Sequence, residues 1–225
     1  MKFNPIKKIK ITSVAAKAYS TNGLFDEGCY GSDCKDECCE YGCDVDVASL
    51  KLIEKNRALI EPLIKAKIED CFSTPLKKDD DYVGGGYRES KVRKADSVCS
   101  FHLHDQRGCS LFYVWGKLGV SKRIVPTICR TYPITWHRGR LFVDEPLRKS
   151  CKCMDKTPTG VKVPSLMETQ AKEIRILFDM QLKKAPAKKA TVKKAAAKKT
   201  IKKKTTAKKA ATKKTATKKK PTKKK

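Results

Sequence analysis

The sequence predicts a small cysteine-rich domain of the α+β class that binds metal, followed by a disordered lysine- and alanine-rich tail. Three observations support this prediction: helix-like and strand-like apolar patterns both occur in residues 1–182, all eleven cysteines lie there, and residues 183–225 contain 21 lysines and no acidic residue. The formal net charge of +28 divides into +7 over residues 1–182 and +21 over residues 183–225. We therefore expect one folded domain over residues 1–182 and a separate basic tail.

The first residues of the chain are basic and contain a short apolar pattern. Ile6, Ile9 and Ile11 predict a strand that packs on the domain, and this interpretation is preferred over an organelle transit peptide because the segment lacks arginine. A secretory signal is not expected, since the apolar run is short and interrupted by hydroxyl residues. We therefore expect a cytoplasmic protein with reduced thiols. No stretch approaches the roughly 18 apolar residues of a membrane helix, so no membrane partner is expected.

Residues 44–70 are predicted to be helical, because their apolar side chains recur at steps of three, four or seven residues. Asp44 or Asp46 can cap the start of this helix. Pro62 cannot lie inside an unbroken helix without removing a hydrogen bond. We therefore expect a break near Glu61, with Pro62 opening a second helical segment.

Local patterns predict the elements that follow. His137–Arg140 separates two short apolar runs, which is typical of a hairpin, and Ser165 with Glu168 forms a capping-box pattern that opens a helix. Gly84–Gly86 is expected to be a flexible turn, because no clear helix and no Lys-Ser/Thr pair follows it. The remaining elements are expected in this order: a loop over 73–97, a strand over 98–103, a short helix over 111–122, hairpin strands over 134–136 and 141–143, and a helix from 166 to about 182.

The cysteines are concentrated in a segment rich in acids and glycine. Five of the eleven lie within the fifteen residues from Cys29 to Cys43. Thiolates suit soft or borderline centres, namely Zn²⁺, Cu(I) and iron–sulfur clusters. Ionised thiolates without metal would repel one another, so we expect metal binding to contribute to folding. The predicted metal ligands are Cys29, Cys34, Cys38, Cys39, Cys43, Cys99, Cys109, Cys129, Cys151 and Cys153.

The spacing of these cysteines favours two metal sites over one. Cys38 and Cys39 are neighbours, and successive side chains of an extended segment point to opposite sides, so the pair serves two centres more easily than one. A zinc finger is disfavoured because C-x2-C pairs are absent. The C-x3-C-x2-C pattern of radical S-adenosylmethionine enzymes would need a cysteine at Tyr41. Cys71 stands alone beside Phe72, and we expect it to be a buried structural residue.

Four segments carry a resemblance to a known family. In order they read Cys34-x3-Cys38-Cys39, Cys99-Ser-Phe, Gly108-Cys109-Ser-Leu and Pro126-x2-Cys129-Arg130-x-Tyr132-Pro133-Ile134. This order resembles the zinc- or iron-chelating cysteine-cluster domain proteins of the CxxCxxCC type, and it is similar to the cysteine-cluster part of flagellin lysine N-methylases. Because the spacing departs from a literal CxxCxxCC, an iron–sulfur cluster and zinc both remain candidate cofactors. The resemblance spans Cys29 to Cys153 and implies that the ligands are Cys34, Cys38, Cys39, Cys99, Cys109 and Cys129.

Further residues near these cysteines have two interpretations each. His102 and His104 are expected to share one face of a strand, where they form a solvated face more readily than they complete a metal shell. Arg130 either neutralises a thiolate-rich centre or forms a surface salt bridge. Tyr132 and Trp136 are expected to pack behind the site.

The tail has a five-residue period. On a helix this step rotates about 140°, so lysines would cover every face and no apolar stripe could dock, which favours disorder. Phosphates would supply the missing counter-charge, and neutralising about 10 of them gives a log–log salt slope near −9. We expect non-specific nucleic-acid binding, with a solubilising role as the alternative. The lysine pairs begin at Lys183, Lys188, Lys193, Lys198, Lys203, Lys208, Lys213, Lys218 and Lys223.

The tail resembles the lysine- and alanine-rich tails of linker-histone-like and bacterial nucleoid proteins, which implies association with the nucleoid. The predicted function is therefore that of a metal-binding cysteine-cluster protein tethered to nucleic acid, with redox sensing or metal handling as consequences. One alternative is a cluster-dependent enzyme, either similar to a protein lysine N-methylase or an oxidoreductase, although no cofactor fingerprint supports it. Another is a folded zinc domain that only presents the tail.

Overall fold

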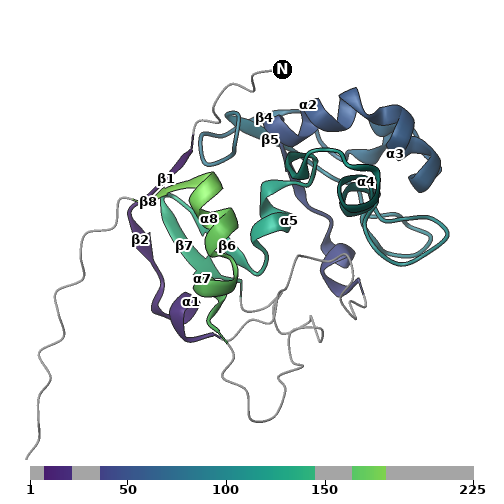
Figure 1. Cartoon of the computed structure of the whole chain (residues 1–225). Coiled ribbons are helices and arrows are strands. Elements are labelled where there is room, and N and C mark those ends of the chain that lie inside the picture. Colours follow the sequence, from purple (N-terminus) through teal and green to yellow (C-terminus); the bar gives the residue numbers. More distant parts are fainter. Residues whose placement is uncertain (1–7, 22–35, 145–163, 181–225) are drawn as a thin grey trace, which may run out of the picture. The chain divides into compact units, whose positions relative to one another are not determined.

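The computed structural model describes residues 8–21, 36–144 and 164–180 of the 225-residue chain. The chain divides into two units, Met1–Ala185 and Pro186–Lys225, and every described residue belongs to the first. That unit contains both helices and strands, which confirms the α+β class (Figure 1). The predicted tail and its lysines lie outside the described residues.

The elements occur in the following chain order, where η marks a 3₁₀ helix. They are β1 (Ile9–Ile11), β2 (Ser13–Val14), α1 (Ala16–Ser20), η1 (Glu37–Tyr41), β3 (Asp44–Asp46), α2 (Val47–Lys55), α3 (Arg57–Ile64), η2 (Ile68–Cys71), β4 (Lys77–Lys78), β5 (Gly86–Glu89), α4 (Ser110–Leu118), η3 (Lys122–Ile124), α5 (Thr127–Thr131), β6 (Ile134–His137), β7 (Arg140–Val143), α7 (Leu166–Thr169), α8 (Ala171–Leu177) and β8 (Phe178–Met180). Within the described ranges, none of the helices has the length and apolar character needed to cross a membrane.

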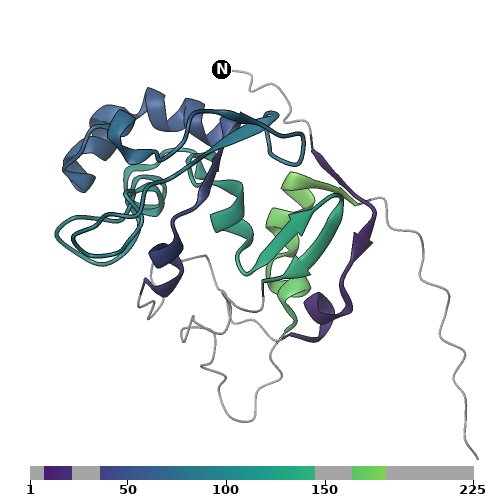
Figure 2. The ribbon, with the colours of Figure 1, turned by 180° about the vertical axis from the view of Figure 1, so that it is seen from behind.

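The predicted hairpin is confirmed as β6 and β7. These strands pair antiparallel through a two-residue turn, in which Arg138 and Gly139 have φ values of 47° and 72°. Two successive left-handed residues match the twist of the flanking strands, which is why such turns form tight hairpins. The strand β2 adds to β7 in parallel, and α7 and α8 lie over one face of the hairpin (Figures 1 and 2).

The predicted N-terminal strand is also confirmed. Ile9 and Ile11 lie in β1 and are buried, whereas Ile6 is outside the described residues. The partner of β1 is β8, and the two strands pair in parallel with Ile9 opposite Phe178. Strand pairing therefore joins the two ends of the described part of the chain.

The C-terminal helix begins as predicted but ends earlier. Ser165 and Glu168 form the expected capping box. The helix is interrupted at Gln170, whose side-chain amide donates to the carbonyl of Tyr132 at 2.9 Å, and α8 ends at Leu177. The prediction of helix to residue 182 is wrong, because pairing with β1 draws the last described residues into a strand.

The break in the helical region lies earlier than predicted. Asp44–Asp46 forms strand β3, and the two helices α2 and α3 meet at Asn56. The Asn56 side chain donates to the Leu52 carbonyl at 2.7 Å. This side-chain hydrogen bond competes with the backbone N–H for the same acceptor, and α2 ends there. Pro62 lies inside α3 instead of opening a helix. Because proline has no backbone N–H, the carbonyl of Ala58 receives no helical hydrogen bond from it, but Ala58 is exposed to water.

The region predicted as a loop over 73–97 contains two strands, β4 and β5, which form a sheet in the order β3-β5-β4. Gly86 permits this pairing, because a Cβ atom there would lie 2.3 Å from the Lys77 carbonyl oxygen. The strand predicted over 98–103 is absent from the structure, where Cys99 and His102 form only isolated bridges. Neighbouring amides in this stretch bond to different segments, so no ladder develops.

The predicted short helix over 111–122 is found as α4, but it spans Ser110–Leu118. It ends at Gly119, which has a left-handed φ of 72° and donates its N–H to the Val114 carbonyl. Glycine adopts this conformation without the steric cost that a Cβ imposes, so it stops helices readily. The residues that follow form the separate 3₁₀ helix η3.

Two groups of buried apolar side chains form the core of the described part. The first joins β1, the β6–β7 hairpin, α7 and α8. The second joins α2, α3 and α4 with the segments that precede α4 and α5. Cysteines pack against both groups, so the sulfur-rich region lies where the two meet. Cys38 contacts the first group, and the second is contacted by Cys39, Cys43, Cys109 and Cys129.

Asp46 connects the start of α2 to the start of α5. The carboxylate is 1% exposed, caps α2 by accepting from the Ser49 amide at 3.0 Å, and accepts from the Thr127 amide at 2.8 Å. The helix α5 carries Cys129 two residues further on. One buried carboxylate therefore positions both helices.

We expect Asp46→Ala to lower the free energy of unfolding by about 3 kcal/mol, because a buried cap and a charged hydrogen bond to a second helix are lost together. Urea unfolding followed by circular dichroism measures this change. Ser165→Ala, which removes the cap of α7 at the surface, serves as the control and should cost about 1 kcal/mol. Equal losses in the two variants would contradict the bridging role of Asp46.

Candidate metal centre

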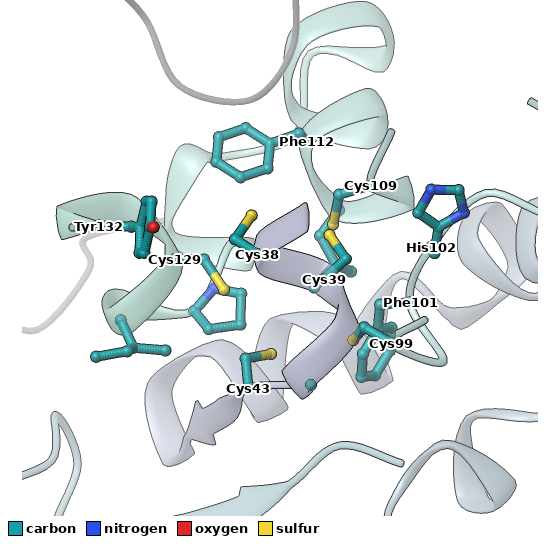
Figure 3. A pocket seen from close by; sticks show the side chains of 14 residues that line it. Cys38, Cys39, Cys43, Cys99, Phe101, His102, Cys109, Phe112, Cys129 and Tyr132 are labelled. Atoms are coloured by element: carbon teal, nitrogen blue, oxygen red, sulfur yellow. The ribbon is translucent and has the colours of Figure 1, made fainter. Parts of the chain in front are cut away.

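Six cysteines converge on one small cavity. The cavity has a volume of about 90 Å³, and its remaining walls are mostly apolar, with Phe112 and Tyr132 on one side (Figure 3). The six come from separate parts of the chain: η1, the segment between η1 and β3, an isolated bridge with Val92, the residue that precedes α4, and α5. They are Cys38, Cys39, Cys43, Cys99, Cys109 and Cys129.

The structure brings together all of the predicted ligand cysteines that it describes. The other four predicted ligands, Cys29, Cys34, Cys151 and Cys153, lie outside the described residues. The eleventh cysteine is fully buried in the second core group, and its thiol donates to the Lys67 carbonyl at 3.4 Å. This residue, Cys71, does not line the cavity, in agreement with the structural role expected for it.

Cys38 and Cys39 lie in a 3₁₀ helix and not in an extended segment. Successive residues of a 3₁₀ helix are separated by about 120° around its axis, so adjacent side chains can reach the same space. Both cysteines line the one cavity. The expectation that they lie in an extended segment and point to opposite sides is therefore wrong for this pair, whereas the number of metal centres stays a prediction. The amide of Cys99 donates to the Cys39 carbonyl at 2.7 Å, which holds η1 against the next cysteine-bearing segment.

Gly42 allows the chain to turn sharply between Cys39 and Cys43. Its φ of 70° is in the left-handed region, and a Cβ atom would lie 3.0 Å from the hydroxyl oxygen of Ser90. A side chain at this position would therefore meet both backbone strain and a close neighbour. Gly42 thereby brings Cys43 back to the cavity.

The thiols form closely interacting pairs. The hydrogen bond with Cys129 and burial raise the pKa of Cys43 well above its usual value, against hydrogen bonds from Cys99 and Ser90 that lower it. The pKa of Cys99 is also raised, first by its hydrogen bond with Cys43 and then by burial. The first effect on Cys129 is a hydrogen bond with Cys43 that lowers its pKa, but burial and neighbouring thiols outweigh it, and the pKa rises to about 11.

Burial also raises the pKa of Cys109, with the charges of Cys39 and Cys99 acting in the same direction. The thiols of Cys43, Cys99, Cys109 and Cys129 are therefore protonated at neutral pH. Thiolates, not thiols, bind metals, so metal binding would release protons from this site.

The donor set fits a soft metal, but the positions do not fit a single ion. Among the described residues, no group of three or more His, Cys, Asp or Glu side chains is arranged to hold one metal ion. A tetrahedral zinc ion binds sulfur at about 2.3 Å and so requires its sulfur ligands within about 4 Å of one another. In a [4Fe–4S] cluster each thiolate binds a different iron atom, so its ligands stand farther apart than those of a single zinc ion. The described cysteines are therefore not arranged for a single zinc ion in this structure.

The two histidines do not share a face, contrary to expectation. His102 lines the cavity beside Cys109, whereas His104 is half-exposed and pairs with Asp105. Both ring nitrogens of His102 face oxygen atoms, with Nδ1 2.7 Å from the Leu103 carbonyl and Nε2 3.3 Å from the Asp36 carboxylate. This arrangement holds the ring at the margin of the cavity and leaves neither nitrogen directed at a metal.

Arg130 forms a buried ion pair, which neither interpretation of the sequence anticipated. Its side chain is 3% exposed, its guanidinium lies 3.4 Å from the Glu173 carboxylate, and it donates to the Thr127 hydroxyl at 3.2 Å. Burial lowers the pKa of Arg130, while Glu173 opposes this shift. Lys122 pairs with the same carboxylate at 2.9 Å. The pair thus ties α5, which carries Cys129, to α8.

Removing Glu173 should be more harmful than removing the whole pair. We expect Glu173→Ala to lower the free energy of unfolding by about 3–5 kcal/mol, because Arg130 is left buried without a counter-charge. The double variant Arg130→Met with Glu173→Leu should recover most of that loss, since apolar residues of similar size replace both charges. Urea unfolding of both variants measures the difference. A double variant less stable than Glu173→Ala would contradict this account.

Sequence reasoning missed Gly42, Asp46 as a bridge between helices, and Ser90, which contacts two of the cavity cysteines. The serine lies in a region that looked like a loop, and no local pattern distinguishes it from other serines. Tyr132 lines the cavity as expected, whereas Trp136 belongs to the first core group and donates to the Asp81 carbonyl at 2.6 Å.

Comparison with known proteins adds no assignment to this geometry. No protein-family model matches the chain, and neither the curated proteins nor the solved structures contain a match. The resemblance to cysteine-cluster proteins therefore stays a prediction.

Proposed function

We propose that the domain binds an iron–sulfur cluster through the cavity cysteines and that the basic tail binds nucleic acid without sequence preference. The observation that supports the first part is the convergence of six cysteines from separate segments on one small cavity. Buried free cysteines that only fill a core have no reason to gather in this way. The ligands in this proposal are drawn from Cys38, Cys39, Cys43, Cys99, Cys109 and Cys129.

The walls of the cavity support the same proposal. Phe112, Tyr132 and Leu111 are among the apolar residues that enclose the sulfur atoms and limit access of water. When bound, an iron–sulfur cluster supplies one-electron redox chemistry, whose potential depends on cluster charge, hydrogen bonds to sulfur and solvent exposure. The protein residues would hold the cluster, exclude water and set that potential.

The second part of the proposal is supported by charge alone. The tail carries +21 over residues 183–225 without an acidic residue, whereas residues 1–182 carry only +7. Dense positive charge of this kind attracts phosphate backbones and gives strongly salt-dependent affinity. The cluster domain and the tail would then act as two separable parts, one sensing redox state or metal and the other attaching the chain to nucleic acid.

An anaerobic preparation of the full chain tests the metal proposal. We expect a brown protein that contains iron and acid-labile sulfide. A colourless protein with stoichiometric zinc would replace the cluster with a zinc site, and a protein free of any metal after reconstitution with iron and sulfide would contradict the proposal. The alternative of a cluster-dependent lysine N-methylase-like enzyme or oxidoreductase has no observation in its favour among the described residues, and it stays a prediction.

A further inference from the structure

Ser90 contacts the sulfur atoms of two cavity cysteines. Its hydroxyl oxygen lies 3.3 Å from Cys99 Sγ and 3.7 Å from Cys43 Sγ, and the residue is 7% exposed. The residue follows β5 directly, so the sheet β3-β5-β4 brings it against Cys43, which lies 47 residues away in sequence, and Cys99, which lies nine residues away. Figure 3 shows both cysteines at the edge of the cavity below η1.

The position of Ser90 is held by backbone contacts on both sides. The Cys43 amide donates to the Ser90 hydroxyl oxygen at 2.8 Å, and the Ser90 amide donates to the Cys43 carbonyl at 2.9 Å. The hydroxyl oxygen therefore already accepts a hydrogen bond from the backbone. Its single O–H remains, and the groups within reach are the two sulfur atoms.

Metal binding would fix the direction of these hydrogen bonds. A metal-bound cysteine has lost its proton, so its sulfur can only accept. The Ser90 hydroxyl then becomes the donor to Cys43 or Cys99, whose sulfur atoms are both within its reach. A donor aimed at a thiolate withdraws negative charge from the sulfur, which favours the reduced and more negative state of a cluster.

We infer that Ser90 is a positioning residue of the metal centre, whose hydroxyl donates to the thiolate of Cys43 or Cys99 and raises the reduction potential of the bound cluster. This inference rests on the proposed function. It adds to the site a residue that is not itself a ligand and that directly follows strand β5. It also explains the need for Gly42, because any side chain there would press on the Ser90 hydroxyl.

A pair of buried serines gives a matched test. Ser100 is 6% exposed, and its hydroxyl donates to the Cys71 carbonyl at 2.7 Å, away from the cavity. Ser90→Ala, Ser90→Thr and Ser100→Ala would be made in the full chain and reconstituted anaerobically with ferrous iron and sulfide. Iron and sulfide content and the midpoint potential, followed by visible absorption, would be compared with those of the unaltered protein.

We expect Ser90→Ala to retain iron and sulfide but to shift the equilibrium constant for one-electron reduction about tenfold towards the oxidised state, equivalent to about 59 mV. Ser100→Ala should leave the potential unchanged, and Ser90→Thr, which keeps a hydroxyl, should restore most of it. Equal potentials in Ser90→Ala and Ser100→Ala would overturn the inference while leaving the metal proposal intact.

If Ser90→Ala loses the cluster, the cause is either the missing hydroxyl or altered packing, and the Ser90→Thr variant distinguishes the two. If Ser90→Thr binds iron with an unaltered potential, the hydroxyl positions the ligands, as inferred. If both variants lose the cluster, Ser90 acts by packing and the inference is wrong. Failure of the unaltered protein to bind iron and sulfide would instead contradict the proposed function, and the inference would fall with it.

Discussion

Replacing Cys129 with alanine is expected to reduce the affinity for the metal centre by about 100-fold or more, because loss of a ligand should exceed the 10- to 100-fold effects of residues that only support ligands. Cys129 interacts with Cys43 and lies on α5, a helix held by both Asp46 and Glu173. Its removal therefore takes away one sulfur without removing the supports of the helix. Iron and sulfide content after anaerobic reconstitution measures the effect.

The matched control is Cys71→Ala. Both substitutions remove one free thiol, but Cys71 is fully buried outside the cavity, and the first cause of its raised pKa, about 11, is burial. This variant should keep the iron content of the unaltered chain and lose only the stability that a buried thiol contributes. Equal iron loss in the two variants would show that the effect comes from misfolding and not from ligand removal.

Metal binding should also stabilise the folded chain in the Cys71→Ala variant but not in the Cys129→Ala variant. A ligand that binds only the folded state stabilises it by about 2.7 kcal/mol when present at 100 times its dissociation constant. Thermal unfolding with and without reconstitution therefore provides a second readout. A stabilisation of equal size in the two variants would argue against Cys129 as a ligand.

Removing residues 183–225 is expected to abolish tight binding to nucleic acid. With about 10 phosphates neutralised, the full chain should show a log–log salt slope near −9, and the truncated chain should lose most of that slope. Filter binding to duplex DNA of mixed sequence at several salt concentrations measures both. The basis is charge: the deletion removes +21 of the total +28.

A tail of the same length in which glutamine replaces each lysine serves as the matched control, because it keeps the length and removes the charge. It should behave as the deletion does, and iron content should be unchanged in both. If either variant keeps the affinity and salt dependence of the full chain, the nucleic acid is bound elsewhere. If iron content falls as well, the two parts of the chain are not independent.

Elements defined by local rules were predictable from the sequence. The β6–β7 hairpin follows from turn residues that accept left-handed φ, and the start of α7 follows from the reciprocal bonds of Ser165 and Glu168. The burial of Ile9 and Ile11 in β1 follows from the alternation of apolar and polar residues along the strand. In each case the residues that decide the structure lie within a few positions of one another.

Elements defined by distant partners were predicted wrongly. Phe178 continues a helical apolar pattern, but it forms a strand pair with Ile9. Cys99 lies in a segment predicted to be a strand, but its backbone amide donates to the Cys39 carbonyl. Asn56 is an exception, because the side-chain bond that accompanies the end of α2 is made to Leu52, only four residues away. These outcomes depend on hydrogen-bond partners that the order of apolar residues does not identify.

The same division applies to the candidate site. The amino-acid composition already points to sulfur and lysine chemistry, because the chain has eleven cysteines and a tail with 21 lysines. The folded chain is needed to learn which cysteines meet, that Cys38 and Cys39 face one cavity, and that Ser90 reaches two of the sulfur atoms. The reason is physical: sulfur chemistry belongs to the residue, whereas the distance between two sulfur atoms depends on how segments remote in sequence pack together.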